Sequence, residues 1–203
     1  MILVTGAGRC GSSLMMQTLN LLGFPLYGEP GDYNSITDHD KEESKRVNPK
    51  GFYEIPVEDI IKLLETGFDE TSKGKAIKIL GSIGWLLDPK DIEKAILCLR
   101  RDREAQAISL HNLANLELSM QKKYKDNRLS KYLTMYKGKS VRDVKTLQDD
   151  TLRLLHDVLS HTNHIVVYFE DILSNPHHEI QRVADFLEID TPIDKAVDNV
   201  IQR

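Results

Sequence analysis

The sequence TGAGRCGSSL, residues 5–14, follows a short apolar run and precedes an amphipathic segment, which is the context of a phosphate-binding loop. Gly6 and Gly11 keep the four-residue gap of a Walker A motif, but Ser12 stands where that motif has its lysine. Glycines let the backbone turn so that successive N–H groups face an anion, and the following helix adds the positive end of its dipole. The residues expected to bind the anion are Gly8, Arg9, Cys10, Gly11, Ser12 and Ser13.

Arg9 is expected to supply the fixed positive charge that the absent lysine would have given, since its planar guanidinium suits two-point contact with a phosphate or sulfate. The missing lysine disfavours chemistry on a nucleoside triphosphate. It favours a ligand whose 5′-phosphate bears a smaller group. Taken alone, the same residues are also compatible with a tight strand-to-helix turn that leaves Arg9 on the surface.

Four short apolar runs, continuous rather than alternating, predict strands that are buried on both faces, as in a parallel sheet. They cover residues 2–4, 76–80, 95–99 and 165–169, and amphipathic helical periods lie between them. This alternation predicts a three-layer α/β/α fold with a central, mostly parallel sheet, in a single domain over residues 1–203.

Residues 28–55 break the alternation, because they are rich in Gly, Pro, Asn, Asp and Ser and show little periodicity. A loop of this length in a compact domain is usually functional or disordered. Since it starts shortly after the first predicted helix, we expect it to reach over the glycine loop (residues 6–13).

The composition is that of an ordinary globular protein, with 40% apolar and 29% charged residues. A formal charge of −4 argues against a general nucleic-acid binder. Residues 121–145 are nevertheless basic, with nine Lys or Arg against two Asp, and form either a solvated helix face or part of a site for an anionic ligand. Within this run, Lys137, Lys139 and Arg142 are the residues expected to contact such a ligand.

The first predicted strand begins at Ile2, and no apolar run approaches the roughly 20 residues that span a bilayer. The sequence therefore predicts neither a signal peptide nor a membrane anchor. Cys10 and Cys98 do not make a disulfide framework, and none of the seven histidines forms a metal-binding pattern. We expect a cytoplasmic protein without a bound metal.

A second polar constellation lies in AILCLRRDREAQAISLHNL, residues 95–113, where a strand runs into a helix. Arg101 stands at the junction and Ser109 follows eight residues later. Together with the glycine loop, this segment resembles the sulfotransferases that use 3′-phosphoadenosine 5′-phosphosulfate (PAPS), a family with a P-loop NTPase-like fold. Arg103 replaces the proline that is usual at this point in the family.

Two further segments are similar to the same family. VVYFEDILSNPHHEIQRVADFLEI, residues 166–189, resembles its strand, asparagine–proline turn and closing helix, although Phe169, preceded by Tyr168, stands at the family's tyrosine position. NPKGFYE, residues 48–54, is similar to a segment of some bacterial-type members. The resemblance therefore covers most of the chain.

The resemblance implies that the glycine loop binds the 5′-phosphosulfate and that Arg101 and Ser109 bind the 3′-phosphate. Two neighbouring strand ends of a parallel sheet supply two such anion sites on one edge. The alternative for Arg101 is a surface salt bridge with Asp102 or Glu104, and for Ser109 an ordinary position on a helix face.

Sulfuryl transfer should resemble phosphoryl transfer, in which the protein mostly aligns the reactants and stabilises charge. Arg9, the loop amides and Ser12 are assigned to the charge on the sulfuryl group and on the departing 5′-phosphate. Lys78 resembles a strand lysine that acts near the transferred group in several family members. The alternative is that Lys78 faces the sheet edge and reaches solvent.

The acceptor hydroxyl or amine must lose a proton, so a base should stand near the glycine loop. Glu29 is the candidate, because some sulfotransferases with a carboxylate base place a glutamate in this region. The alternative for Glu29 is a loop carboxylate in water or paired with a lysine. Asp32, His39 and His111 are lesser candidates.

Two rival functions stay open at this point. A small P-loop kinase using ATP suits the chain length, and Glu170 or Asp171 could imitate its metal-binding acid. A non-catalytic nucleotide-binding relative is the other rival. For a sulfotransferase we expect a small-molecule or glycan acceptor; neither its identity nor an oligomeric state follows from the sequence.

Overall fold

The computed structural model describes residues 1–28, 53, 55, 57–68, 70–121 and 135–202. Its centre is a four-stranded parallel sheet with the strand order β2-β1-β3-β4. The strands are β1 (Ile2–Thr5), β2 (Ala76–Lys78), β3 (Lys94–Leu99) and β4 (His164–Tyr168). The predicted parallel sheet is confirmed, with strand boundaries that differ by one or two residues. The two that matter most are that β2 ends at Lys78 rather than at residue 80, and that Phe169 begins a helix rather than ending β4.

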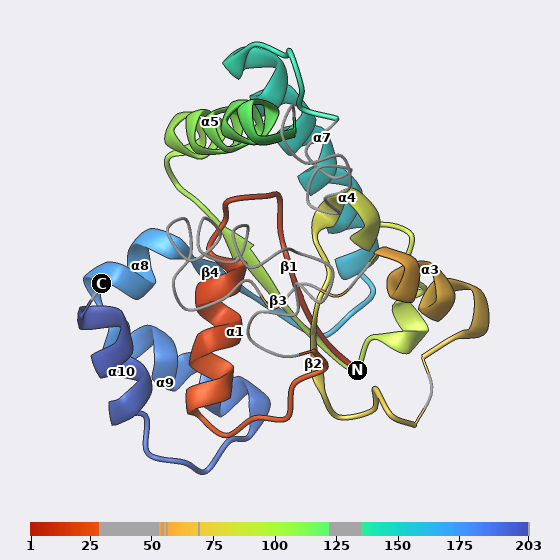
Figure 1. Ribbon diagram of the computed structural model, residues 1–203. Coiled ribbons are helices and arrows are strands. Elements are labelled where there is room, and N and C mark those ends of the chain that lie inside the picture. Colours follow the sequence, from red (N-terminus) through yellow and green to blue (C-terminus); the bar gives the residue numbers. More distant parts are fainter. Residues whose placement is uncertain (29–52, 54, 56, 69, 122–134, 203) are drawn as a thin grey trace.

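Helices cover both faces of the sheet, so the predicted three-layer α/β/α fold is confirmed (Figure 1). One face packs against α1 (Ser12–Leu21), α8 (Phe169–Ser174), α9 (Pro176–Leu187) and α10 (Asp194–Ile201). The other face packs against α3 (Val57–Thr66), α7 (Val141–Leu159) and the segment between β2 and β3, which contains α4 (Gly81–Gly84) and a short 3₁₀ helix, Pro89–Asp91.

Alternate residues of β1 point to the two faces, as the pleat of a strand requires. Ile2 and Val4 enter the cluster with α1, whereas Leu3 enters the cluster with α7. Because both clusters are apolar, every residue of β1 is buried. This double burial is why the strands show continuous apolar runs in the sequence.

A third apolar cluster joins α5 (Arg103–Gln121) to the first turns of α7. It contains Ala107, Leu110, Ala114, Tyr136 and Val144. Figure 1 shows this helix pair beyond the carboxyl end of the sheet, above the turn that follows β1. The pair therefore places two helix faces next to the glycine loop.

Helix α7 begins at a capping box, in which two backbone N–H groups are satisfied reciprocally. The Asp143 N–H donates to Ser140 Oγ at 3.2 Å, and the Ser140 N–H donates to the Asp143 carboxylate at 3.2 Å. The cap ends the preceding turn and fixes the start of the helix that reaches the glycine loop.

Among the described residues, no helix has both the length and the apolar character that a bilayer span requires.

Candidate active site

The glycine loop connects β1 to α1 through three residues with positive φ. Gly6 has φ of 151°, Arg9 has 65°, and Gly11, the N-cap of α1, has 96°. Two of these positions are glycines, which adopt such values at little cost. Arg9 is the exception, because L-residues other than glycine rarely populate the left-handed region.

Close packing beneath the loop explains why two positions carry no side chain. A Cβ on Gly6 would lie 2.3 Å from the Cys98 carbonyl oxygen, and one on Gly11 would lie 2.7 Å from Phe169 Cδ2. The loop is therefore pressed against the ends of β3 and β4.

Cys10 and Cys98 lie under the loop and are both buried. Burial raises the pKa of both thiols, most strongly that of Cys98, and hydrogen bonds from Ser12 only partly oppose the effect at Cys10. Both side chains are thus neutral thiols of the core. A contact between Cys10 and a ligand would have to come from its backbone.

Arg9 and Ser109 lie in contact, although they are 100 residues apart in the sequence. Arg9 Nε donates to Ser109 Oγ at 3.0 Å. The contact follows from the pairing of β1 with β3, because the loop after β1 and the helix after β3 start at the same edge of the sheet. The first and second motifs of the sequence therefore meet in one place.

Lys78, the last residue of β2, also reaches the loop. Its Nζ donates to Ser13 Oγ at 3.0 Å, and the residue is only 3% exposed. The alternative of a lysine that reaches solvent is therefore wrong, although β2 is an edge strand. The lysine missing from the Walker position has a counterpart in space, supplied by the neighbouring strand.

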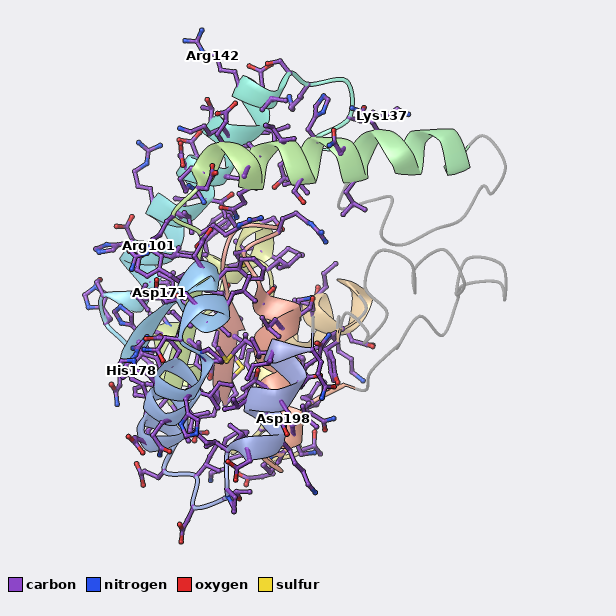
Figure 2. The ribbon with its side chains drawn as sticks, turned by 90° about the vertical axis from the view of Figure 1, so that its left-hand side faces the viewer. Arg101, Lys137, Arg142, Asp171, His178 and Asp198 are labelled. Atoms are coloured by element: carbon purple, nitrogen blue, oxygen red, sulfur yellow. The ribbon has the colours of Figure 1, made fainter. Side chains whose placement is uncertain are left out.

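Arg101 turns toward the end of β4 instead of toward the glycine loop. Its Nε and Nη2 donate to the Asp171 carboxylate at 3.1 and 2.6 Å, and its guanidinium lies 4.0 Å from the centre of the Tyr168 ring. Figure 2 shows Arg101 and Asp171 beside each other at the surface. A surface ion pair therefore exists, with Asp171 as the partner in place of Asp102 or Glu104. The hydrogen bond from Arg101 lowers the pKa of Asp171.

Arg100, which the sequence reading did not single out, lies closer to the core than Arg101. Its side chain is 20% exposed, its guanidinium lies 4.8 Å from the Phe169 ring centre, and its Nε donates to Glu170 at 3.4 Å. Glu170 also accepts from the Arg101 N–H at 3.0 Å. The two carboxylates after β4 are thus both engaged by arginines after β3.

Two buried glutamines support the loop from outside, and the sequence reading missed both. Gln106 of α5 donates through Nε2 to the carbonyls of Ala7 at 3.0 Å and Gly8 at 2.9 Å. Gln148 of α7 donates to the same Gly8 carbonyl at 2.9 Å. The only signal for Gln148 was its place on the otherwise apolar stripe of its helix, between Val144 and Leu155.

The basic residues predicted to contact a ligand do not lie at the loop. Lys137, Lys139 and Arg142 are exposed, and Figure 2 shows Lys137 and Arg142 at the tip of the α5–α7 pair, away from Arg101. His111 lies beside Asn115 on α5. Glu29, Asp32 and His39 lie outside the described residues, as does most of the predicted loop at residues 28–55.

Among the described residues, no group of three or more His, Cys, Asp or Glu side chains is placed to hold a metal ion. The chemical groups gathered at the loop are instead cations, hydroxyls and backbone amides. This set suits a bound anion.

The sequence matches no protein-family model and no curated protein. Among solved structures, a retinol dehydratase in complex with androsterone and the inactive cofactor PAP has a TM-score of 0.49 and 13% identity, covering 98% of this chain and 63% of that one. The chain thus spans less than two thirds of that protein's length.

Two other solved structures are sulfotransferase domains. One comes from the curacin biosynthetic pathway, with a TM-score of 0.47 and 12% identity over 100% of this chain and 78% of that one. The other comes from the Synechococcus PCC 7002 olefin synthase, with a TM-score of 0.40 and 15% identity over 99% of this chain and 76% of that one.

Proposed function

We propose that this protein is a sulfotransferase that moves a sulfuryl group from PAPS to a hydroxyl or amine of a small-molecule or glycan acceptor. The observation that carries the proposal is the hydrogen bond between Arg9 and Ser109. It joins the loop proposed for the 5′-phosphosulfate to the helix proposed for the 3′-phosphate. A donor with acidic groups at both ends of its ribose needs two such sites close together.

The glycine loop is the proposed site of the 5′-phosphosulfate. The first N–H groups of α1 have no partner within their own helix, and the helix dipole adds positive potential at the same point. Gly8 to Ser13 supply amides and hydroxyls, and Arg9 and Lys78 supply positive charge. In this arrangement the protein aligns the donor and stabilises negative charge during in-line transfer, with no covalent role of its own.

Arg101 and Ser109 are the proposed contacts of the 3′-phosphate. Ser109 already lies at the loop, whereas Arg101 would have to share or leave Asp171. Ion pairs between exposed side chains are weak, so a doubly charged phosphate can compete with the carboxylate. Arg101 should therefore contribute less to donor affinity than Arg9.

Glu29 is the proposed base for the acceptor. It follows the first helix and Gly28, the last described residue before position 53. A glutamate here would stand on the acceptor side of the loop and remove the proton of the attacking group. The chemistry of the acceptor is otherwise set by residues 28–55.

A kinase that uses ATP and magnesium is the competing enzyme. It would need an acidic residue at a strand end to hold the metal. Glu170 and Asp171, the candidates from the sequence, pair with Arg100 and Arg101. These pairings favour the sulfotransferase, and ligand specificity separates the two enzymes.

Adenosine 3′,5′-bisphosphate is expected to raise the Tm of the protein, whereas ATP and GTP, with or without magnesium, are not. Arg9→Ala should weaken bisphosphate binding about 10- to 100-fold, the effect of losing one charge-assisted contact. Arg101→Ala should weaken it less. The measurement is a thermal-shift titration, in which the stabilisation follows the ratio of ligand concentration to Kd.

The matched control is Arg153→Ala, which removes a 74% exposed arginine on α7 and should leave bisphosphate binding unchanged. Stabilisation by magnesium–ATP but not by the bisphosphate would support the kinase instead. Bisphosphate binding without transfer of sulfate to any of a broad panel of alcohols, phenols, sugars and amines would support the non-catalytic relative.

A further inference from the structure

Three consecutive carbonyls of the glycine loop accept hydrogen bonds from outside the loop. The Gly81 N–H donates to the Gly6 oxygen at 3.0 Å. Gln106 donates to the Ala7 and Gly8 oxygens, and Gln148 adds a second donor to the Gly8 oxygen. Both acceptor sites of the Gly8 carbonyl are thus used by side chains that are 0% exposed.

Holding a carbonyl also orients the next N–H group. A trans peptide is planar, and its C=O and N–H point in opposite directions. With the oxygens of Gly6, Ala7 and Gly8 directed at α4, α5 and α7, the N–H groups that follow them are turned to the opposite side. Arg9 then takes a left-handed conformation, φ 65°, and such a change of hand along a loop makes successive N–H groups converge on an anion.

The orientation of the Gln106 amide is itself fixed. Arg103 donates to Gln106 Oε1, and its guanidinium also donates to Asp149 at 2.7 Å. With its oxygen engaged by Arg103, the amide must present Nε2 to the loop. Arg103 stands where the resembled family usually has a proline. The arginine at this position orients the Gln106 amide.

Gln148 shows that the arrangement is not optimised for stability. Its Oε1 is buried and has no hydrogen-bond partner among the described residues. Leaving a buried acceptor unpaired is unfavourable, and an apolar side chain on this stripe of α7 would avoid it. Among the described residues the only hydrogen bond of this amide is to the Gly8 carbonyl, which indicates a role in the loop.

We propose that Gln106 and Gln148 are positioning residues that hold the Ala7, Gly8 and Arg9 amides in the orientation that binds the donor's 5′-phosphosulfate. The identity of the anion in this proposal rests on the proposed function. The orientation of the amides does not, because it follows from the hydrogen bonds to the Ala7 and Gly8 carbonyls. The two glutamines do not touch the anion; they act through the Ala7 and Gly8 carbonyls.

The test replaces each glutamine with methionine, which keeps the length of the side chain and removes its donor. Binding of adenosine 3′,5′-bisphosphate is measured by calorimetry and stability by denaturant unfolding. Gln106→Met should weaken binding about tenfold and Gln148→Met about threefold, because Gln106 holds two carbonyls and Gln148 holds one. Affinities within twofold of wild type in both variants would overturn the proposed role.

Two controls separate positioning from loss of fold. Gln181→Met removes an exposed amide that bonds only Asp185 among the described residues and should bind like wild type. Leu187→Ala on α9, a core position far from the loop in the sequence, should lower stability without weakening binding. If Leu187→Ala weakens binding as much as Gln106→Met at equal loss of stability, the role of Gln106 is only structural.

Gln106→Glu gives a readout that a structural role would not produce. An ionised carboxylate cannot donate to the Ala7 and Gly8 carbonyls, whereas a protonated one can donate to one of them. Burial raises the pKa of the introduced carboxyl, and the Arg103 guanidinium, which donates to the side chain at position 106, lowers it, so the titration of this carboxyl is followed directly by NMR. The ratio of variant to wild-type affinity should rise as the carboxyl takes up its proton, and a ratio that stays flat through that titration would contradict the proposal.

A failure of the proposed function can be told apart from a failure of this inference. In ¹⁵N NMR spectra, inorganic sulfate should shift the amide signals of Ala7, Gly8 and Arg9 in the wild type and should shift them less in Gln106→Met. If sulfate does so while the bisphosphate does not bind, the nucleotide assignment fails and the positioning role stands. If the three amides do not respond to sulfate, or respond equally in the variant, the positioning role fails.

Discussion

Lys78→Met is expected to lower the rate of sulfuryl transfer about 100- to 1000-fold, the cost of removing one preorganised donor from a developing negative charge. Lys78 Nζ lies 3.0 Å from Ser13 Oγ, in the loop proposed for the sulfuryl group. The side chain is only 3% exposed, so water cannot replace its charge effectively. The assay follows release of adenosine 3′,5′-bisphosphate from PAPS with 4-nitrophenol as acceptor and with water as the background reaction.

The same substitution should leave the fold intact. Methionine has nearly the length of lysine, and replacing a buried charge with an apolar side chain of similar volume is often neutral or stabilising. Lys75→Met, just before the start of β2, is the matched control, because Lys75 lies at the opposite end of the strand and contacts the Tyr27 ring. An unchanged transfer rate in Lys78→Met, with unchanged stability, would remove Lys78 from the mechanism.

The fold could be predicted because its strands and helices follow from local patterns in the sequence. Each strand is buried on both faces, so each appears in the sequence as a continuous apolar run, and the helices show their buried stripes. The boundaries were less accurate. The run at residues 76–80 extends past the pairing of β2, because Ile79 stays buried in the core after the strand has ended.

The site was predictable only where one segment of chain determines it. Gly6 and Gly11 could be recognised because a tight strand-to-helix turn needs positive φ. From the sequence, Arg9 and Ser109 could be assigned only to two separate anion sites. Their contact depends on the pairing of β1 with β3, which brings the two segments together. No feature of the sequence indicates the left-handed conformation of Arg9.

The partner of Arg101 illustrates the same limit. Asp102 and Glu104 were the nearest acids in the sequence, but the Asp102 carboxylate accepts a hydrogen bond from the Ala105 N–H at the start of α5. Asp171, 70 residues away, lies in the first turn of α8, the helix after β4, and β4 pairs with β3. Sheet order therefore decides the ion pair, and sheet order cannot be read from the spacing of residues.

Gly6→Ala is expected to destabilise the protein by roughly 3 kcal/mol or more, the range in which overpacking and backbone strain combine. Its Cβ would lie 2.3 Å from the Cys98 carbonyl oxygen and 2.7 Å from Cys10 Sγ, and φ is 151°. The carbonyl belongs to the backbone of β3 and cannot rotate away as a side chain would. Relief must come from displacement of the loop, so binding of the bisphosphate should be lost even where the variant still folds.

Alanine variants at two other glycines separate the contributions of overpacking and backbone strain to this loss of stability. Gly23 has φ of 73°, and no atom lies within 4 Å of the place that a Cβ would take, so Gly23→Ala should cost only the left-handed conformation, about 1 kcal/mol. Gly11→Ala should lie between the two, because its Cβ would meet the Phe169 ring, which is able to shift. Urea unfolding of the three variants measures the series. Equal losses for Gly6→Ala and Gly23→Ala would mean that the loop is not held against β3, because a loop free to move away would escape the contact with Cys98.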